Sequence, residues 1–142
     1  MPLTRRVLLV SPNSELREQL ARWLKKAGLR TLCSVTVGGA LQKLARAPVG
    51  LLLCEAELPD GNFRDLLRHV NRSGAAVPVV VLSPSDDCEP YLSAMRDGAF
   101  DYLAYPSPHN EMERVVHNAL TEASRRHTLA LADADSGAAI SG

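Results

Sequence analysis

The sequence alternates between short apolar runs and segments with helical periodicity, and this alternation restricts the possible folds more than any other feature. The apolar runs have the length of strands and cover residues 7–10, 29–35, 49–54, 77–82 and 102–104. After each run, apolar residues recur every three or four positions, as they do on the buried side of an amphipathic helix. Five strands and five helices in strict alternation predict a parallel sheet with helices on both faces.

The runs at 49–54 and 77–82 are almost uninterrupted, which is typical of strands covered on both faces. Crossovers between parallel strands are right-handed, so few topologies remain. A chain of 142 residues suits one domain with a single core. We therefore predict a doubly wound α/β fold of the flavodoxin-like type, with the strand order 2-1-3-4-5.

Two parts of the chain differ in composition. We expect residues 1–126 to form the folded domain. Residues 127–142 are rich in Ala, Asp, Ser and Gly and have too few large apolar side chains to build a core. They are predicted to extend the last helix and then to form a flexible linker or tail.

Composition argues against several classes of function. The 16 basic and 16 acidic side chains cancel, so direct nucleic-acid binding has no electrostatic support. No apolar run is long enough to span a membrane, and the run after Arg6 is too short for a secretory signal.

The cysteines (Cys33, Cys54 and Cys88) are odd in number and show no CxxC spacing. We expect reduced thiols and a cytoplasmic protein. The four histidines lack ligand spacing, so no metal site is expected.

Polar side chains stand at the predicted ends of the strands. Ligand chemistry in open parallel sheets gathers outside the carboxyl ends of the strands, so these residues are the candidates for a site. They are Ser11 and Pro12 after the first strand, Glu55 after the third, Ser83 after the fourth and Tyr105 after the fifth. Glu55 is the most unusual, because the stretch LLLCEAELPDG carries a carboxylate directly at the end of an apolar run.

Four segments carry a resemblance to a known family. They read VLLVSPNSELREQL, LLLCEAELPDGNFRDLL, VPVVVLSPSDD and DGAFDYLAYPSP. From about residue 6 to residue 123 the chain resembles the CheY-like receiver domain of bacterial response regulators. The resemblance implies two-component signal transduction and transcription regulation. In that family, two acids after the first strand hold Mg²⁺, and an aspartate that ends the third strand is phosphorylated by a partner histidine kinase.

The resemblance also implies that most of the phosphorylation chemistry has been lost. Ser11 and Pro12 stand where the family has its acid pair, and Glu55 stands at the phosphoacceptor position. Tyr105 replaces a lysine, although Pro106 after it is kept. Mg²⁺ requires hard, charged oxygen ligands, which a serine hydroxyl and a proline do not supply. We therefore expect neither metal nor cofactor, and no catalytic activity.

Other family positions are kept or altered without a loss of charge. Ser83 matches the hydroxyl that ends the fourth strand, and Tyr102 matches the aromatic switch residue. Phe63 takes the place of a common glycine after the third strand.

Glu55 is interpreted as a built-in stand-in for a charged aspartyl phosphate, or as its relic. The alternative is an ordinary solvated acid at a strand end.

The leading hypothesis is an atypical receiver, a pseudo-receiver that acts by protein–protein contact without Mg²⁺-dependent phosphorylation. Its expected partners are a fused or separate output domain, such as a DNA-binding transcription regulator, and a second copy. Homodimerisation would use the face of the fourth helix, fifth strand and fifth helix, which includes Arg96, Tyr102, Glu113 and His117. One alternative is a receiver that is still phosphorylated, on Glu55 or elsewhere. Another is a flavodoxin-like cofactor-binding protein, although SPNSEL lacks the glycine of a phosphate loop.

Overall fold

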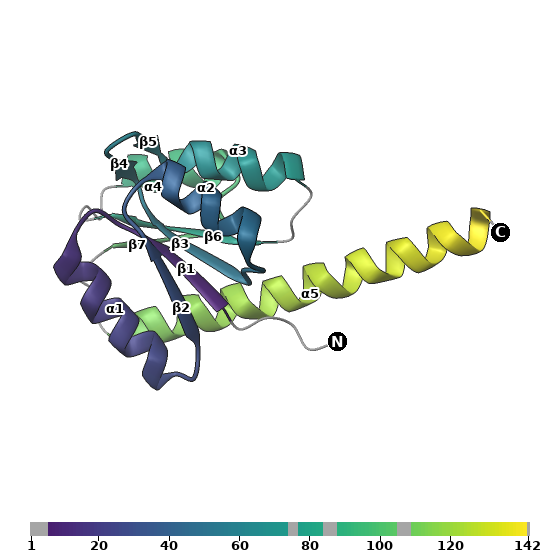
Figure 1. Ribbon diagram of the computed structural model, residues 1–142, viewed down its shortest axis with the longest axis horizontal. Helices are drawn as coiled ribbons and strands as arrows, with labels where there is room; N and C mark the ends of the chain where they lie inside the picture. The colour runs from purple at the N-terminus through teal and green to yellow at the C-terminus, as the bar shows by residue number, and fades with distance from the viewer. Residues whose placement is uncertain (1–5, 74–76, 84–87, 105–108, 142) are drawn as a thin grey trace.

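The computed structural model describes the backbone of residues 6–73, 77–83, 88–104 and 109–141, and side chains within these ranges except at 88–90, 109 and 130–141. Five of its strands form one parallel sheet in the order β2-β1-β3-β6-β7 (Figure 1). The strands are β1 (Arg6–Val10), β2 (Arg30–Ser34), β3 (Leu51–Glu55), β6 (Val79–Ser83) and β7 (Asp101–Ala104). If these five strands are numbered 1 to 5 along the chain, their order in the sheet is 2-1-3-4-5, as predicted. The flavodoxin-like fold is therefore confirmed.

Helices cover both faces of the sheet. They are α1 (Ser14–Lys26), α2 (Val37–Arg46), α3 (Phe63–Ser73), α4 (Cys88–Arg96) and α5 (His109–Ser141). Figure 1 shows α1 and α5 on one face and α2, α3 and α4 on the other. Each helical crossover therefore joins two parallel strands of the sheet, and the crossover through α2 passes from β2 over β1 to β3, as in the predicted topology.

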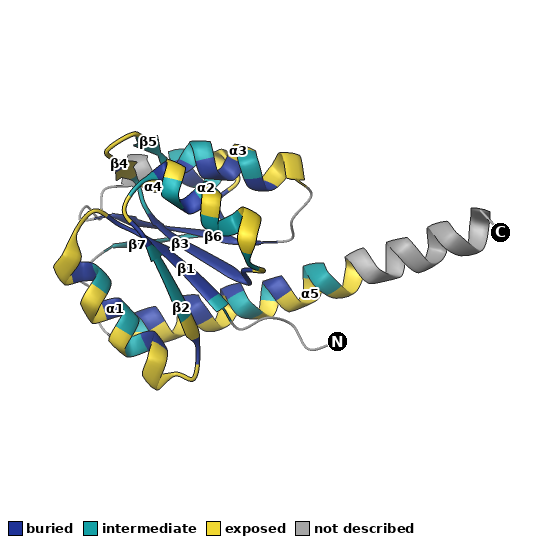
Figure 2. Cartoon of the chain, in the orientation of Figure 1, coloured by how far each residue is buried: buried dark blue, intermediate teal, exposed yellow. Residues whose placement is uncertain are grey.

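The core has two layers because successive strand residues point to opposite faces of the sheet. In β1, Leu8 and Val10 pack with residues of α2, α3 and α4. Val7 and Leu9 pack with residues of α1 and α5. All four side chains are fully buried, and Figure 2 shows the same burial along the central strands. The uninterrupted apolar runs thus reflect a sheet that is covered on both faces.

A small hairpin after β3 was not predicted. The strands β4 (Glu57–Leu58) and β5 (Gly61–Asn62) pair antiparallel around Pro59 and Asp60, where the sequence indicated only a turn. Leu58, within β4, and Phe63, directly after β5, are both buried in the core. These two anchors bring the short segments together, which explains why they pair despite having two residues each.

The last helix is longer than predicted. Helix α5 comprises 33 residues and extends well beyond the sheet (Figure 1). It includes the predicted helix extension and continues through most of the segment that was predicted as a linker or tail. The division of the chain near residue 126 and the linker role remain predictions. Within the described part of the chain, no helix combines the length and apolarity that crossing a membrane requires.

Candidate functional site at the carboxyl edge of the sheet

The carboxyl ends of the central strands meet at one edge of the sheet. Val10 of β1 pairs with Cys54 of β3, and Glu55 pairs with Leu82 of β6. Ser11 and Glu55 therefore lie next to each other at the ends of adjacent strands, and Ser83 lies at the end of β6. Ser11 and Ser83 are buried, whereas Glu55 is half-buried. The structure thus brings three of the predicted site residues, Ser11, Glu55 and Ser83, to the same edge of the sheet.

Ser11 is the most constrained residue of this edge. Its hydroxyl donates a hydrogen bond to Oε2 of Glu55 and accepts one from the backbone N–H of Asn13 at 3.0 Å. Its own N–H donates to the carbonyl of Ser34 at 2.9 Å. Its carbonyl accepts from Nη1 of Arg17 at 2.6 Å. Because the residue is fully buried, these contacts fix the direction of its hydroxyl towards Glu55.

The turn after Ser11 is held by the start of α1. Asn13 is the N-cap, and its side-chain oxygen accepts a hydrogen bond from the N–H of Leu16 at 3.1 Å. Capping of this kind satisfies one of the free N–H groups at a helix start. Pro12 is exposed and has no side-chain ligand atom. The position that follows Ser11 therefore contributes backbone shape and no charge.

Arg17 belongs to this edge although the sequence analysis did not identify it. It lies in α1 and is half-buried, and its guanidinium reaches back to the end of β1. In the sequence, an arginine on the polar side of an amphipathic helix is indistinguishable from a solvated side chain. The one feature that could have indicated a role at the site is its position shortly after the end of a strand.

The backbone around Glu55 is held by β6 and by a contact within β3. The N–H of the next residue, Ala56, donates to the carbonyl of Leu82 at 2.9 Å. The preceding residue, Cys54, is fully buried, and its thiol donates to the carbonyl of Glu55 at 3.1 Å. Burial, with a smaller effect of the negative Glu55, raises the pKa of the Cys54 thiol far above its ordinary value. A neutral, buried thiol of this kind is inert, so Cys54 is a packing residue.

Two further predicted residues lie around β7. Tyr102 is half-buried, and its ring packs edge-on against the ring of Tyr91 of α4, with centroids 5.9 Å apart and planes at 87°. The predicted switch position is therefore in contact with α4. Tyr105 falls outside the described residues, so its predicted place near Glu55 remains a prediction.

The residues of this edge do not fit a magnesium site. Mg²⁺ in proteins takes near-octahedral oxygen ligation that includes one or two carboxylates. Among the described residues that were predicted to form the site, the one carboxylate is that of Glu55. It already accepts a hydrogen bond from the hydroxyl of Ser11. Among the residues that the structure describes, no group of three or more His, Cys, Asp or Glu side chains is placed to hold a metal ion.

The hairpin that follows Glu55 is fastened to α2. The carboxylate of Asp60 accepts from the N–H of Val37 at 2.7 Å and from the N–H of Gly38 at 3.0 Å. These backbone hydrogen bonds hold the pKa of Asp60 below its ordinary value. A negative charge at a helix N-terminus is also favoured by the helix dipole. Asp60 therefore fixes the hairpin to the start of α2.

Comparison with known proteins agrees with this arrangement. The family model described as the response regulator receiver domain matches residues 7–117. The response regulator protein PilR of Pseudomonas aeruginosa is 30% identical over 115 residues, which are 81% of this chain and 26% of PilR. The DNA-binding transcriptional regulator NtrC of Escherichia coli K12 is 31% identical over 117 residues, 81% of this chain and 24% of NtrC. This chain thus spans about a quarter of the length of these relatives.

Solved structures share the fold. A CheY-like receiver domain protein from Methanospirillum hungatei superposes with a TM-score of 0.77 at 19% identity, covering 87% of this chain and 98% of that one. The beryllofluoride-activated NtrC4 receiver domain dimer gives a TM-score of 0.78 at 18% identity, covering 84% and 99%. With the family match over most of its length, this chain belongs to the response regulator receiver domain family.

Proposed function

We propose that this chain is an atypical receiver, a pseudo-receiver that works by protein contact and without Mg²⁺-dependent phosphorylation of an aspartate. The observation that carries the proposal is the hydrogen bond from the Ser11 hydroxyl to the Glu55 carboxylate. At the end of β1, where the family has acids that hold a metal ion, this chain has a neutral donor. The carboxylate is thereby satisfied from within the protein.

Energetics favour this closed pair over a metal complex. A hydrogen bond to a charged group stabilises a protein by about 1.5–3 kcal/mol. Binding Mg²⁺ at this edge would require breaking that bond and stripping water from the ion, in exchange for a single carboxylate. Without the metal, the repulsion between a carboxylate and a phosphoryl donor is not offset by an ion that bridges the two groups.

Glu55 supplies a permanent negative charge where the family adds charge by phosphorylation. Glutamate has less charge and fewer acceptor oxygens than an aspartyl phosphate, but its extra methylene extends its reach. The closed pair with Ser11 is compatible with both meanings of Glu55, a stand-in for the modified residue or its relic.

A module without chemistry acts through its surface and is not an enzyme. We propose that it regulates a fused or separate output domain in the cytoplasm, because PilR and NtrC are by name regulators and NtrC is by name DNA-binding. Contact with a second copy would use α4, β7 and α5. On this face Tyr91 and Leu92 of α4 are 40% and 49% exposed, which supports a contact surface.

The proposal is tested by incubating the purified chain with acetyl phosphate and Mg²⁺ and measuring its intact mass. We expect no phosphoryl adduct, while a receiver that has the complete acid set gains one in the same buffer. An adduct that depends on Mg²⁺, on Glu55, Ser83 or another residue, would show that the chain is still phosphorylated and would overturn the proposal.

A further inference from the structure

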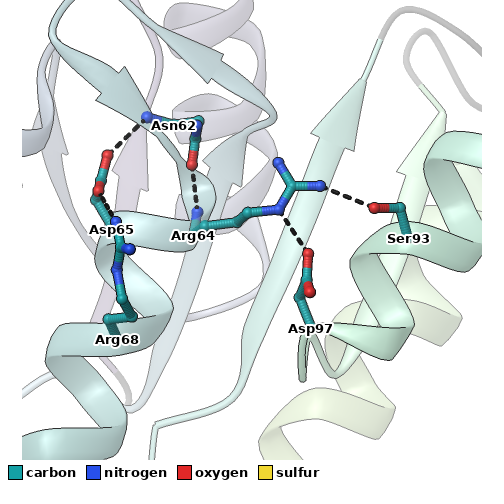
Figure 3. Close-up of polar contacts among 6 residues, drawn as sticks. All are labelled: Asn62, Arg64, Asp65, Arg68, Ser93 and Asp97. Atoms are coloured by element: carbon teal, nitrogen blue, oxygen red, sulfur yellow. Dashed lines mark hydrogen bonds and ion pairs between the residues drawn. The ribbon is translucent and has the colours of Figure 1, made fainter.

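Arg64 connects the segment after Glu55 with helix α4. It is the second residue of α3, and Figure 3 shows its side chain reaching across to α4. Its Nε lies 2.5 Å from Oδ2 of Asp97, and its Nη2 donates to the hydroxyl of Ser93 at 2.8 Å. Ser93 and Asp97 are one helical turn apart. Two donors of one rigid guanidinium therefore fix both the position and the rotation of the C-terminal end of α4.

The base of Arg64 is rigid. Its N–H donates to Oδ1 of Asn62 at 2.9 Å, while the carboxylate of Asp65 accepts from the N–H of Asn62 at 3.1 Å. The two side chains thus satisfy two backbone N–H groups at the start of α3 (Figure 3). The guanidinium also lies over the ring of Phe63, 4.7 Å from its centroid, and that ring is buried in the core. The arginine is thus held by its backbone and by an aromatic face.

Helix α4 buries fewer side chains than α3 within the described residues. Of its side chains at positions 91–96, only that of Ala94 is fully buried, and Tyr91 and Leu92 are largely exposed. Helix α3, by contrast, buries one aromatic and three aliphatic side chains. At positions 91–96, the contacts of Arg64 therefore add polar attachments to the apolar ones that Ala94, Met95 and Tyr91 make.

The other end of this connection is the candidate site. The N–H of Phe63 donates to the carbonyl of Ala56 at 3.2 Å, and Ala56 follows Glu55 directly. This hydrogen bond closes the hairpin and so connects the end of β3 to Phe63, the residue that precedes Arg64.

We infer that Arg64, Ser93 and Asp97 form a clamp, here called the Arg64 clamp, that couples the Glu55 segment to the position of α4. Arg64 acts as a positioning residue and touches no reacting group. The coupling holds whether or not the chain accepts a phosphoryl group, so its test and the phosphorylation test fail independently.

Amide hydrogen exchange of the full chain tests the clamp. We expect Arg64→Ala to increase exchange of the amides at 92–97 by about two- to five-fold, as loss of one partly exposed ion pair predicts. Arg64→Lys keeps the charge but not the two-pronged contact, and we expect an intermediate effect. The matched control is Arg68→Ala, because Arg68 is also in α3 but pairs with Asp65 of its own helix. Equal exchange in α4 for the Arg64→Ala and Arg68→Ala variants would overturn the clamp.

A double-mutant cycle tests the coupling itself. Glu55→Ala should change exchange at 92–97 when Arg64 is present, and this change should be largely lost in the Arg64→Ala background. The coupling is wrong if Glu55→Ala leaves α4 unchanged, or if its effect has the same size without Arg64. Circular dichroism of each variant establishes that the helices are retained, so that faster exchange reports local opening.

Discussion

The hydroxyl of Ser11 donates a hydrogen bond to Oε2 of Glu55, a residue 44 positions away in the chain. The contact exists because β1 and β3 are neighbours and pair with Val10 opposite Cys54. A fully buried serine and a half-buried glutamate are thereby each given a partner.

Ser11→Ala should lower the free energy of unfolding by about 1–3 kcal/mol, because the Glu55 carboxylate loses its hydrogen-bond donor. Urea denaturation measures the loss. Ser34→Ala is a matched control, since Ser34 is also a buried serine at a strand end, but its hydroxyl donates to a backbone carbonyl, that of Thr36. We expect a loss of about 1 kcal/mol or less for that variant. Equal losses for both variants would mean that the charge of Glu55 adds nothing.

Restoring the family's acids and lysine should restore phosphorylation only as a set. The chain with Ser11→Asp, Pro12→Asp, Glu55→Asp and Tyr105→Lys is expected to gain a phosphoryl adduct with acetyl phosphate and Mg²⁺. Glu55→Asp alone should gain none, because groups that act as a unit are strongly non-additive. Intact mass measured with and without Mg²⁺ distinguishes the variants. An adduct on the single variant would show that the remaining pocket is chemically sufficient.

The contribution of Asp60 to stability should depend on pH. Its folded-state pKa is lowered by hydrogen bonds from Gly38 and Val37, so its stabilisation is complete above the ordinary pKa of 3.8 and is lost as the pH falls through the folded pKa. The Tm difference between wild type and Asp60→Ala should therefore shrink in acid. Melting curves between about pH 6 and about pH 2 measure this change. Asp60→Asn keeps a hydrogen-bond acceptor without a titrating charge, and its difference from Asp60→Ala should stay constant.

If the face of α4, β7 and α5 binds a second copy, Arg96→Glu with His117→Glu should weaken that association by about ten-fold or more, because two exposed positions gain negative charge. Sedimentation velocity over a range of concentrations measures the dimer. Arg22→Glu with Lys26→Glu is the control for added charge, since both residues are exposed and belong to α1, which is not part of this face. Unchanged association in the first variant, or an equal loss in the control, would assign the contact elsewhere.

The sheet was predictable because burial on both faces leaves a direct trace in the sequence. A run such as LLLC in β3 has no polar alternative, and alternation with helices restricts its neighbours. The meeting of Ser11 and Glu55 at one edge follows from that topology. The hydrogen bond between them does not, because it depends on side-chain directions that the order of strands leaves open.

The features that sequence reasoning missed depend on single long-range contacts. Arg17 and Arg64 look like ordinary solvated positions of amphipathic helices, since nothing in their spacing marks the residues they reach. The β4–β5 hairpin is too short to show strand periodicity. Asp60 has the sequence signature of a turn residue, and its contact with the start of α2 spans more than twenty positions.

Helix α5 has a mechanical consequence. With 33 residues it is about 50 Å long, whereas a strand of five residues in the sheet spans about 17 Å. A helix of this kind is a rigid lever whose far end turns by about 100° and advances by about 1.5 Å for each residue added or removed. The orientation of anything attached near the far end of α5 would therefore depend on the number of helical residues between it and the sheet. Deletion of one of these residues would rotate the attached group by about 100° and move it by only about 1.5 Å along the helix.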